Sequence, residues 1–201
     1  LGYLLSVFDF EPGIKHTAAM TAVINDQGAM FFTDTHVQLD PSAEQIASAT
    51  LQASYRLRLF GIDPKVALLS HSNFGSHSDA SAVKMRRARE LVLEQRPGLE
   101  IDGEMMADTA LNEALRKHIF PGTRLEGSAN LMVMPNLDAA NIGYNLVRVV
   151  TNGVAIGPIL MGIDQPAHIL TPASTARRVV NMTAIAAVDA QLRAERKNGG
   201  G

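Results

Sequence analysis

Apolar positions along this chain follow two patterns, short continuous runs and recurrences every three or four residues. The short runs are bounded by turn residues and predict strands, whereas the recurrences predict helices. The predicted strands cover residues 18–24, 29–33, 65–69, 99–101, 129–134 and 155–161. Because helical stretches separate most of these strands, the pattern predicts an α/β fold with a mostly parallel sheet covered by helices.

Residues that favour helix caps indicate where the helices begin. Asp40, followed by Pro41, is expected to begin a helix that ends at Gly61. Asp138 is expected to cap the helix after the fifth strand, and Ser174 is expected to cap the last helix. The other predicted helices cover residues 80–95 and 111–118.

Composition narrows the classes of function. The 201 residues carry a net charge of −2, which gives no electrostatic reason to expect binding to nucleic acid or to an anionic membrane. The longest apolar stretch, residues 147–163, is interrupted by Arg148, Asn152 and several glycines and is not expected to span a membrane. The chain has no cysteine, which excludes disulfides and thiolate metal sites and agrees with a cytoplasmic location. Because it begins at Leu1 rather than Met, we expect a fragment of a longer protein.

A polar loop at residues 70–78 has the composition of an anion-binding site. It lies between a predicted buried strand and a predicted helix, where ligands bind in α/β folds. Serine hydroxyls supply donors there, and a glycine lets the backbone approach a ligand closely. The candidate residues are Ser72, Asn73, Gly75 and Ser76. The alternative is a polar loop whose serines cap the next helix.

A second polar segment holds three carboxylates within seven residues. Asp102, Glu104 and Asp108 could hold Mg²⁺ or act as a base. The pattern favours a simpler structure, with a tight turn at Asp102-Gly103 and a helix cap at Asp108.

Two histidines in the first polar loop raise the question of a metal. His71 and His77 lie close to Asp79 in the sequence and could loosely form a site. No HExxH motif and no second ligand cluster accompanies them, and loop histidines are far commoner than metal ligands. We therefore expect no metal site in this chain.

Four motifs, the third of them in two pieces, resemble the phosphate acetyl/butyryl transferase family in order along the chain. Residues 70–76 are similar to its SxSTxGS loop, and residues 102–111 to its DGExxxDAAL segment. Residues 127–145 and 155–162 are similar to AGxANxLxFPDLxAGNIxYK and AIGPxxQG. Residues 166–191 match many of the nonpolar positions of PVNDLSRGxSxDDIVNxxAITAxQ. Their sequence resembles the C-terminal phosphotransacetylase-like domain of bacterial NADP-dependent malic enzymes.

The resemblance implies a fold and a division of the chain. The fold is the three-layer α/β/α phosphotransacetylase (isocitrate dehydrogenase-like) type with a mostly parallel sheet. Residues 1–165 would form one α/β subdomain. Residues 166–197 would form a turn and a helix that complete the cleft with the truncated other subdomain, and residues 198–201 would form a tail.

Several polar residues of the family are replaced in this chain. The replacements are Asn145 for a lysine, Val149 for an arginine, Thr171 for a serine, Pro172 for an arginine, and Arg177 and Arg178 for an acidic pair. Acyl transfer needs a polar group to assist the thiol and a cation to stabilise the transition state. The replacements therefore imply degenerate catalytic positions and a domain that binds a CoA thioester without turning it over.

The resemblance also implies an effector and partners. The implied function is regulation and oligomerisation of an NADP-dependent malic enzyme, which converts malate to pyruvate, CO₂ and NADPH. No cofactor is expected in this chain, because the malic-enzyme domain of the same polypeptide would bring NADP and Mg or Mn. A homodimer or higher homo-oligomer is expected, with helices at 111–118 and 181–192 at the interface. Acetyl-CoA is expected to bind at Ser72, Asn73, Gly75, Ser76, Asn136, Asn141, Gly157, Pro158, Thr171 and Pro172.

Three alternatives stay open at this point. Asn136 and Asn141 could cap the helix near Asp138 instead of binding a ligand. The chain could be an active phosphate acetyltransferase that moves acetyl between CoA and phosphate, since Thr171 keeps a hydroxyl. It could also be a purely structural dimerisation domain with an empty cleft.

Overall fold

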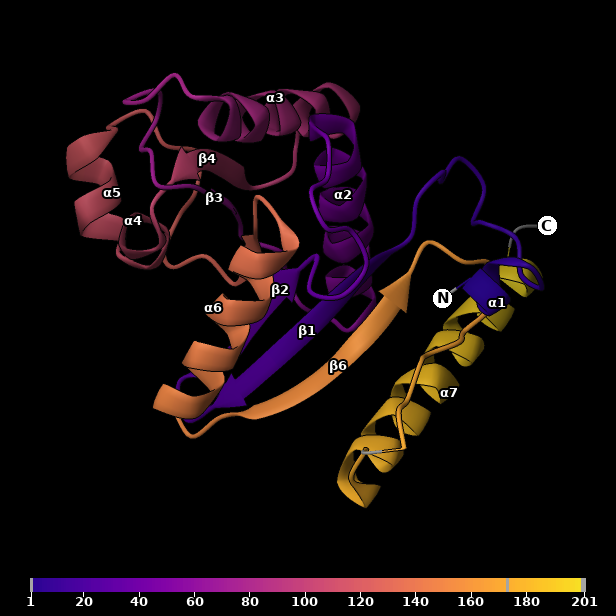
Figure 1. Cartoon of the computed structure of the whole chain (residues 1–201). Helices are drawn as coiled ribbons and strands as arrows, with labels where there is room; N and C mark the ends of the chain where they lie inside the picture. Colours follow the sequence, from indigo (N-terminus) through magenta and orange to yellow (C-terminus); the bar gives the residue numbers. More distant parts are fainter. Residues whose placement is uncertain (1, 173, 200–201) are drawn as a thin grey trace.

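The computed structural model describes residues 2–172 and 174–199 and is built on one six-stranded sheet (Figure 1). The strand order is β4-β3-β5-β2-β1-β6. Pairs β4-β3, β3-β5 and β5-β2 are parallel, while β1 is antiparallel to both β2 and β6, which confirms the mostly parallel sheet. The strands are β1 Ala18–Asn25, β2 Gly28–Thr33, β3 Val66–Leu69, β4 Ile101–Met105, β5 Leu131–Val133 and β6 Val154–Met161.

Helices cover the sheet on both faces. They are α1 Gly2–Leu5, α2 Ala43–Leu59, α3 Ala80–Gln95, α4 Ala107–Leu111, α5 Glu113–Ile119, α6 Leu137–Val150 and α7 Ala176–Gly199. Strand β3 shows why its sequence is a continuous apolar run. Val66 and Leu68 join a core cluster with α2 and α3, while Ala67 and Leu69 join a second cluster with α4 and α6. Successive side chains of a strand point to opposite faces, so a strand buried on both faces has no polar side. The three-layer α/β/α prediction is confirmed.

Helix α7 lies beside strand β6 at the edge of the sheet (Figure 1). Buried charges hold it there. Asp189 of α7 forms an ion pair with Arg56 of α2, and both side chains are almost fully buried. Arg193 of α7 bonds Asp189 Oδ1 at 3.0 Å and Glu11 Oε1 at 2.6 Å. Because a buried charge without its partner is costly, this cluster fixes the position of α7 on the domain.

Two predicted N-caps are wrong by two residues. Helix α2 begins at Ala43 with Ser42 as its cap, and Ser42 and Gln45 form a reciprocal capping box, so Asp40 lies outside the helix. Helix α6 is capped by Asn136, whose Oδ1 accepts the Ala139 N–H at 2.9 Å, and not by Asp138. In both segments several residues have side-chain oxygens, and only the residue with extended backbone before the first turn can reach the free N–H groups.

The cap of α7 also differs from the prediction. Ser174 Oγ accepts the Thr171 N–H at 3.1 Å and so closes the preceding turn. Thr175 Oγ1 accepts the Arg178 N–H at 3.2 Å and caps α7 instead. The helix continues to Gly199, beyond the predicted end at 197, and residues 200–201 lie outside the described part of the chain.

The turn predicted at Asp102-Gly103 is wrong, because both residues lie inside the buried strand β4. Gly103 has a φ of +133°, and a Cβ there would lie 2.7 Å from the Leu68 carbonyl oxygen, so the close approach of β3 requires glycine. The Asp102 carboxylate accepts bonds from Thr123 Oγ1 and the Arg124 N–H, both at 2.8 Å. Partners far along the chain therefore make a carboxylate acceptable in this strand.

The predicted helix at 111–118 is two short helices. Asn112 separates α4 from α5 and caps α5 by accepting the Leu115 N–H at 3.0 Å. The cap position of α4 is Met106, so Asp108 lies in the first turn of α4 and is not its cap. Within the described residues, no helix is long and apolar enough to cross a membrane.

Candidate functional site

Two adjoining cavities lie between β6, α6 and the start of α7, and both are lined by His36 and Arg178. The first cavity has a volume of about 330 Å³, and its other lining residues include Tyr144, Asn145, Arg148, Gly157, Arg177 and Asn181. The second has a volume of about 360 Å³ and is also lined by Ala19, Val37, Pro158, Leu160, Ile169 and Thr171. One cavity is thus rich in cations and amides, and its neighbour is mostly apolar.

The cations of the first cavity have few partners. Arg178 Nε donates to the Gly157 carbonyl oxygen at 3.0 Å. Across residues 2–172 and 174–199, Arg148 and Arg177 form no hydrogen bond or ion pair, and neither cavity is lined by a carboxylate. Positive charge therefore accumulates in this cleft without an internal counter-charge.

His36 adds a titratable group to both cavities. Its Nδ1 lies 2.9 Å from Thr35 Oγ1, which in turn lies 2.9 Å from Thr21 Oγ1. Partial burial lowers the pKa of His36, and the charge of Arg178 lowers it further. Sequence reasoning missed this residue. The available signal was its position just after the carboxyl end of strand β2, where α/β folds place ligand-binding side chains.

Asp34 holds the backbone of this segment in place. Its carboxylate accepts the N–H groups of Ala19, His36, Val37 and Gln38 at 3.0–3.1 Å. Burial raises the pKa of Asp34, although these four hydrogen bonds act to lower it. The side chain thus has a structural role, and it positions His36 in the cleft.

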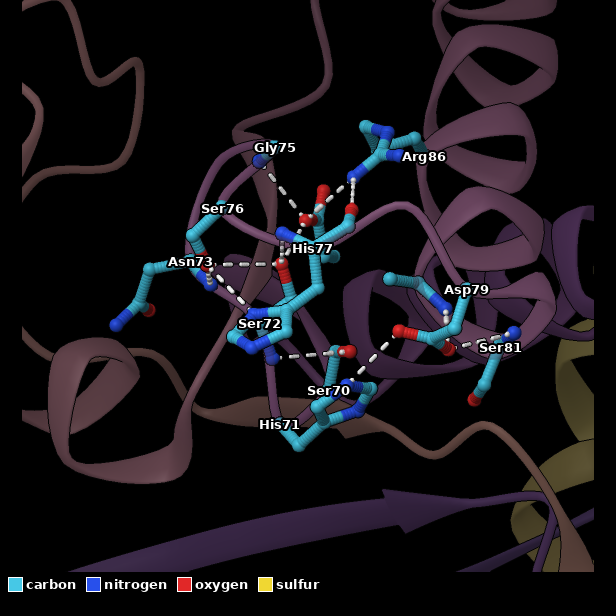
Figure 2. A network of polar contacts seen from close by, with 12 residues as sticks. Ser70, His71, Ser72, Asn73, Gly75, Ser76, His77, Asp79, Ser81 and Arg86 are labelled. Carbon is cyan, nitrogen blue, oxygen red and sulfur yellow. Dashed lines mark hydrogen bonds and ion pairs between the residues drawn. The ribbon is translucent and has the colours of Figure 1, made fainter.

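The loop at residues 70–78 has folded around a carboxylate of the same chain (Figure 2). Three of the residues labelled in Figure 2, Ser72, Gly75 and Arg86, share one acceptor, and the hydrogen bonds identify it as Glu104 Oε1. The Ser72 hydroxyl donates to it at 2.6 Å, the Gly75 N–H at 2.9 Å and Arg86 at 2.8 Å. Glu104 and Ser72 are both fully buried. The donors that indicated an anion site therefore surround an internal anion.

The remaining loop groups bond to one another. The Asn73 N–H donates to Ser76 Oγ at 3.0 Å, and the His77 N–H donates to Ser72 Oγ at 3.1 Å. Gly75 has a φ of +88° and open space around its missing Cβ, so the backbone conformation and not a close contact favours glycine here.

One loop histidine, His71, contacts the residue that caps α3. His71 Nε2 lies 2.9 Å from Asp79 Oδ2, and Asp79 caps α3. A hydrogen bond from the Ala82 N–H is the largest effect that lowers the pKa of Asp79, and the proximity of His71 lowers it further. In the described part of the chain, no group of three or more His, Asp or Glu side chains is arranged to hold a metal.

The residues predicted to bind acetyl-CoA fall into separate groups. Gly157 lines the first cavity, and Pro158 and Thr171 line the second. Asn136 caps α6, and Asn141 accepts a bond from Asn145 Nδ2 at 2.9 Å, so the capping alternative holds for Asn136. Neither cavity lining includes Ser72, Asn73, Gly75, Ser76, Asn136, Asn141 or Pro172.

Curated relatives of this chain are malic enzymes. It is 51% identical over 187 residues to the NADP-dependent malic enzyme of Escherichia coli, and this alignment covers 92% of this chain and 25% of the relative. It is also 51% identical over 177 residues to the NAD-dependent malic enzyme of Rhizobium meliloti, covering 88% and 23% of the two chains. The chain therefore spans about a quarter of these relatives.

Solved structures and a family model agree on the fold. The EutD phosphotransacetylase from Staphylococcus aureus superposes with a TM-score of 0.87 at 30% identity, over 92% of this chain and 58% of that one. The family model described as phosphate acetyl/butaryl transferase matches residues 3–187. This chain belongs to the phosphate acetyl/butaryl transferase family.

Proposed function

We propose that this chain is a regulatory domain of a malic enzyme that binds acetyl-CoA and has no transferase activity of its own. Malic enzymes that depend on NADP and on NAD are similar to it to the same extent. We therefore expect the choice between these cofactors, and the Mg or Mn site, to lie in the part of the polypeptide outside this chain.

The loss of transferase activity rests on the cleft residues. At position 178 the family has an acid, and here an arginine stands there with its Nε bonded to the Gly157 carbonyl oxygen. Pro172 replaces the neighbouring arginine and carries no charge. Removing one group that stabilises a developing charge typically lowers the rate by about 10²–10³-fold, and several such groups are replaced here.

Acetyl-CoA binding rests on the two adjoining cavities. Pro158, Leu160 and Ile169 offer an apolar wall for a thioester, and the neighbouring cavity offers cations for phosphates. The pairing of an apolar pocket with a few convergent polar groups is typical of cofactor sites. To regulate malate turnover, acetyl-CoA must bind one state of the enzyme more tightly than the other.

The test is calorimetry with acetyl-CoA, with an assay of acetyl transfer from acetyl phosphate beside it. Ile169→Trp should fill the apolar cavity and weaken acetyl-CoA binding by about tenfold or more. Ile119→Trp is the matched control, because Ile119 has the same exposure of 39% and lines neither cavity. In the full-length enzyme, Ile169→Trp should remove the response to acetyl-CoA and leave malate oxidation intact. Transfer at the rates of the family's enzymes, or no binding heat, would refute the proposal.

We also propose that the chain self-associates. An apolar stripe runs along α6, where Ile142, Leu146, Val149 and Val150 are 59%, 59%, 69% and 82% exposed. Exposed contiguous apolar surface of this kind marks interfaces. The two segments first expected at the interface, 111–118 and 181–192, carry fewer exposed large apolar side chains, Leu111 and Val188. Light scattering should give a dimer mass, and Leu146→Lys should shift it toward the monomer. A monomer mass for the unaltered chain would refute this part.

A further inference from the structure

We propose that Arg148, Arg177 and Arg178 form a binding site for a phosphate group in the first cavity. This site is separate from the loop at residues 70–78, whose donors already surround Glu104. The inference does not require that acetyl-CoA is the physiological ligand, because the three side chains would bind a phosphate whichever molecule carries it.

The geometry places the three cations on two walls of one cavity. Arg148 lies in the last turn of α6, and Arg177 and Arg178 lie in the first turn of α7. Arg178 uses only Nε, on the Gly157 carbonyl oxygen, and its other nitrogens donate to no residue in the described ranges. A guanidinium carries five donors in a planar fork that fits phosphate oxygens, so many donors remain for a ligand.

The lining of this cavity carries like charges without a counter-charge among its described residues. Three cations meet with no carboxylate among the described lining residues. Arg177 and Arg178 also lie at the positive end of the α7 dipole, and the first turn of α7 has no acidic residue. A bound phosphate would neutralise these charges and would sit at a helix N-terminus, which favours anions.

Three other arginines of the same fold are paired with carboxylates. Arg86 bonds Glu104 at 2.8 Å, Arg193 bonds Glu11 at 2.6 Å, and Arg56 pairs with Asp189. Carboxylates thus neutralise these three arginines, whereas the fully buried Arg116 donates its hydrogen bonds to backbone carbonyl oxygens. Arg148, Arg177 and Arg178 differ from these in that the described part of the chain supplies no carboxylate for them.

The size of the cavity indicates an organic phosphate. Its volume of about 330 Å³ lies at the lower end of the range for small-molecule pockets, and a free phosphate ion would fill only part of it. Asn145 and Asn181 add neutral donors and acceptors to the lining. The occupant is therefore a phosphate ester or diphosphate of a small molecule, with inorganic phosphate as its simplest probe.

The replacements relative to the family fit this arrangement. Cations are missing at Asn145, Val149 and Pro172, but the family's acidic pair has become Arg177 and Arg178. The positive charge of the cleft has thus moved from one set of positions to another. Only the structure reveals this, because Arg148 on α6 meets the α7 pair across the cavity.

The experiment is calorimetry of the chain with inorganic phosphate at constant ionic strength. Arg148→Gln and Arg177→Gln should each weaken phosphate binding by about tenfold or more, as expected for the loss of one charge-assisted hydrogen bond. Arg58→Gln is the control, because Arg58 is an exposed helical arginine that lines neither cavity. Equal phosphate affinity in all three variants, or no phosphate binding to the unaltered chain, would overturn the proposal.

A second measurement separates binding at this site from binding elsewhere. A phosphate beside His36 stabilises its imidazolium form, so phosphate should raise the pKa of His36 in an NMR titration. The rise should vanish in Arg177→Gln and persist in Arg58→Gln. A His36 pKa that phosphate leaves unchanged would contradict a site in this cavity.

CoA and dephospho-CoA distinguish the sources of the phosphate. If the 3′-phosphate of CoA occupies the site, dephospho-CoA should bind more weakly than CoA to the unaltered chain. The difference in affinity should be smaller for Arg177→Gln. If inorganic phosphate binds but neither CoA form does, the phosphate site stands and acetyl-CoA binding in this cleft fails. The two proposals can therefore fail separately.

Discussion

Two regions of this domain gather anion-binding groups, and they differ in where the anion comes from. The loop at residues 70–78, together with Arg86, surrounds the carboxylate of Glu104. The cleft at the start of α7 gathers three arginines with no carboxylate in the described lining. Within the first region the carboxylate pairs with Arg86, although its buried Oε2 accepts no hydrogen bond from the described residues, whereas no carboxylate lines the second region. Similar residue types can thus build part of a core or a ligand site.

The titratable groups of the two regions support this contrast. Beside the loop, a hydrogen bond and the proximity of His71 lower the pKa of Asp79, so a carboxylate there is stabilised in its charged form. In and behind the cleft, burial lowers the pKa of both His36 and His168, and a nearby arginine adds to the effect in each case. The charge of an arginine thus adds to burial in disfavouring the charged form of both histidines, and burial also raises the pKa of Asp34 beside His36.

The largest expected effect comes from removing the internal anion. Glu104→Ala should lower the free energy of unfolding by about 3–5 kcal/mol, because it leaves Arg86, Ser72 and the Gly75 N–H without their shared acceptor. Urea denaturation measures this loss. Glu113→Ala is the control, because Glu113 pairs with Lys117 on the surface and should change the urea midpoint little. If both variants unfold at the same midpoint, Glu104 is not the anion that completes the loop.

The second prediction concerns the loss of stability in acid that His168 causes. Burial, and then the charge of Arg56, lower the pKa of His168 from 6.5 to about 4. The unfolded chain therefore binds this proton more tightly, so the stability is fully present above pH 6.5 and is lost as the pH falls toward 4. Between pH 7 and pH 5 the loss from this one group is about 2 kcal/mol.

His168→Gln isolates that loss, because it keeps an acceptor for the Leu160 N–H, which His168 Nδ1 accepts at 3.2 Å. Urea midpoints of both proteins at the two pH values give the difference. The variant should lose less stability on acidification than the unaltered chain. An identical pH dependence would mean that His168 is protonated in the folded domain without penalty.

The comparison also explains which parts of the structure could be predicted from the sequence. Strands such as β3 and β1 follow from apolar runs, because burial on both faces excludes polar residues. Strand β4 was misread as a turn, because Asp102 and Glu104 look like surface residues. Their partners Arg89 and Arg86 come from α3, earlier in the chain, and no local pattern reveals those pairings.

The cleft was predicted only in part for a similar physical reason. Gly157, Pro158 and Thr171 were expected there and do line the cavities. His36 was missed, because a single histidine after a strand carries no spacing signal. The loop was expected to face the ligand, but whether its donors point to solvent or to Glu104 depends on how β4 packs against β3.

The smallest expected effect is a change in the free energy of unfolding that has opposite signs in the two regions. Arg177→Gln removes a cation that has no partner in the described chain and that lies at the positive end of α7, so it should stabilise the ligand-free domain by about 0.3–1 kcal/mol. Arg86→Gln should instead destabilise the domain, because Glu104 loses a charge-assisted bond of 2.8 Å. Urea denaturation at low ionic strength measures both, and added salt should reduce the gain in Arg177→Gln, since exposed charges are screened. If Arg177→Gln destabilises the domain as Arg86→Gln does, then Arg177 already has an internal partner, and the contrast between a loop with an internal anion and a cleft without one fails.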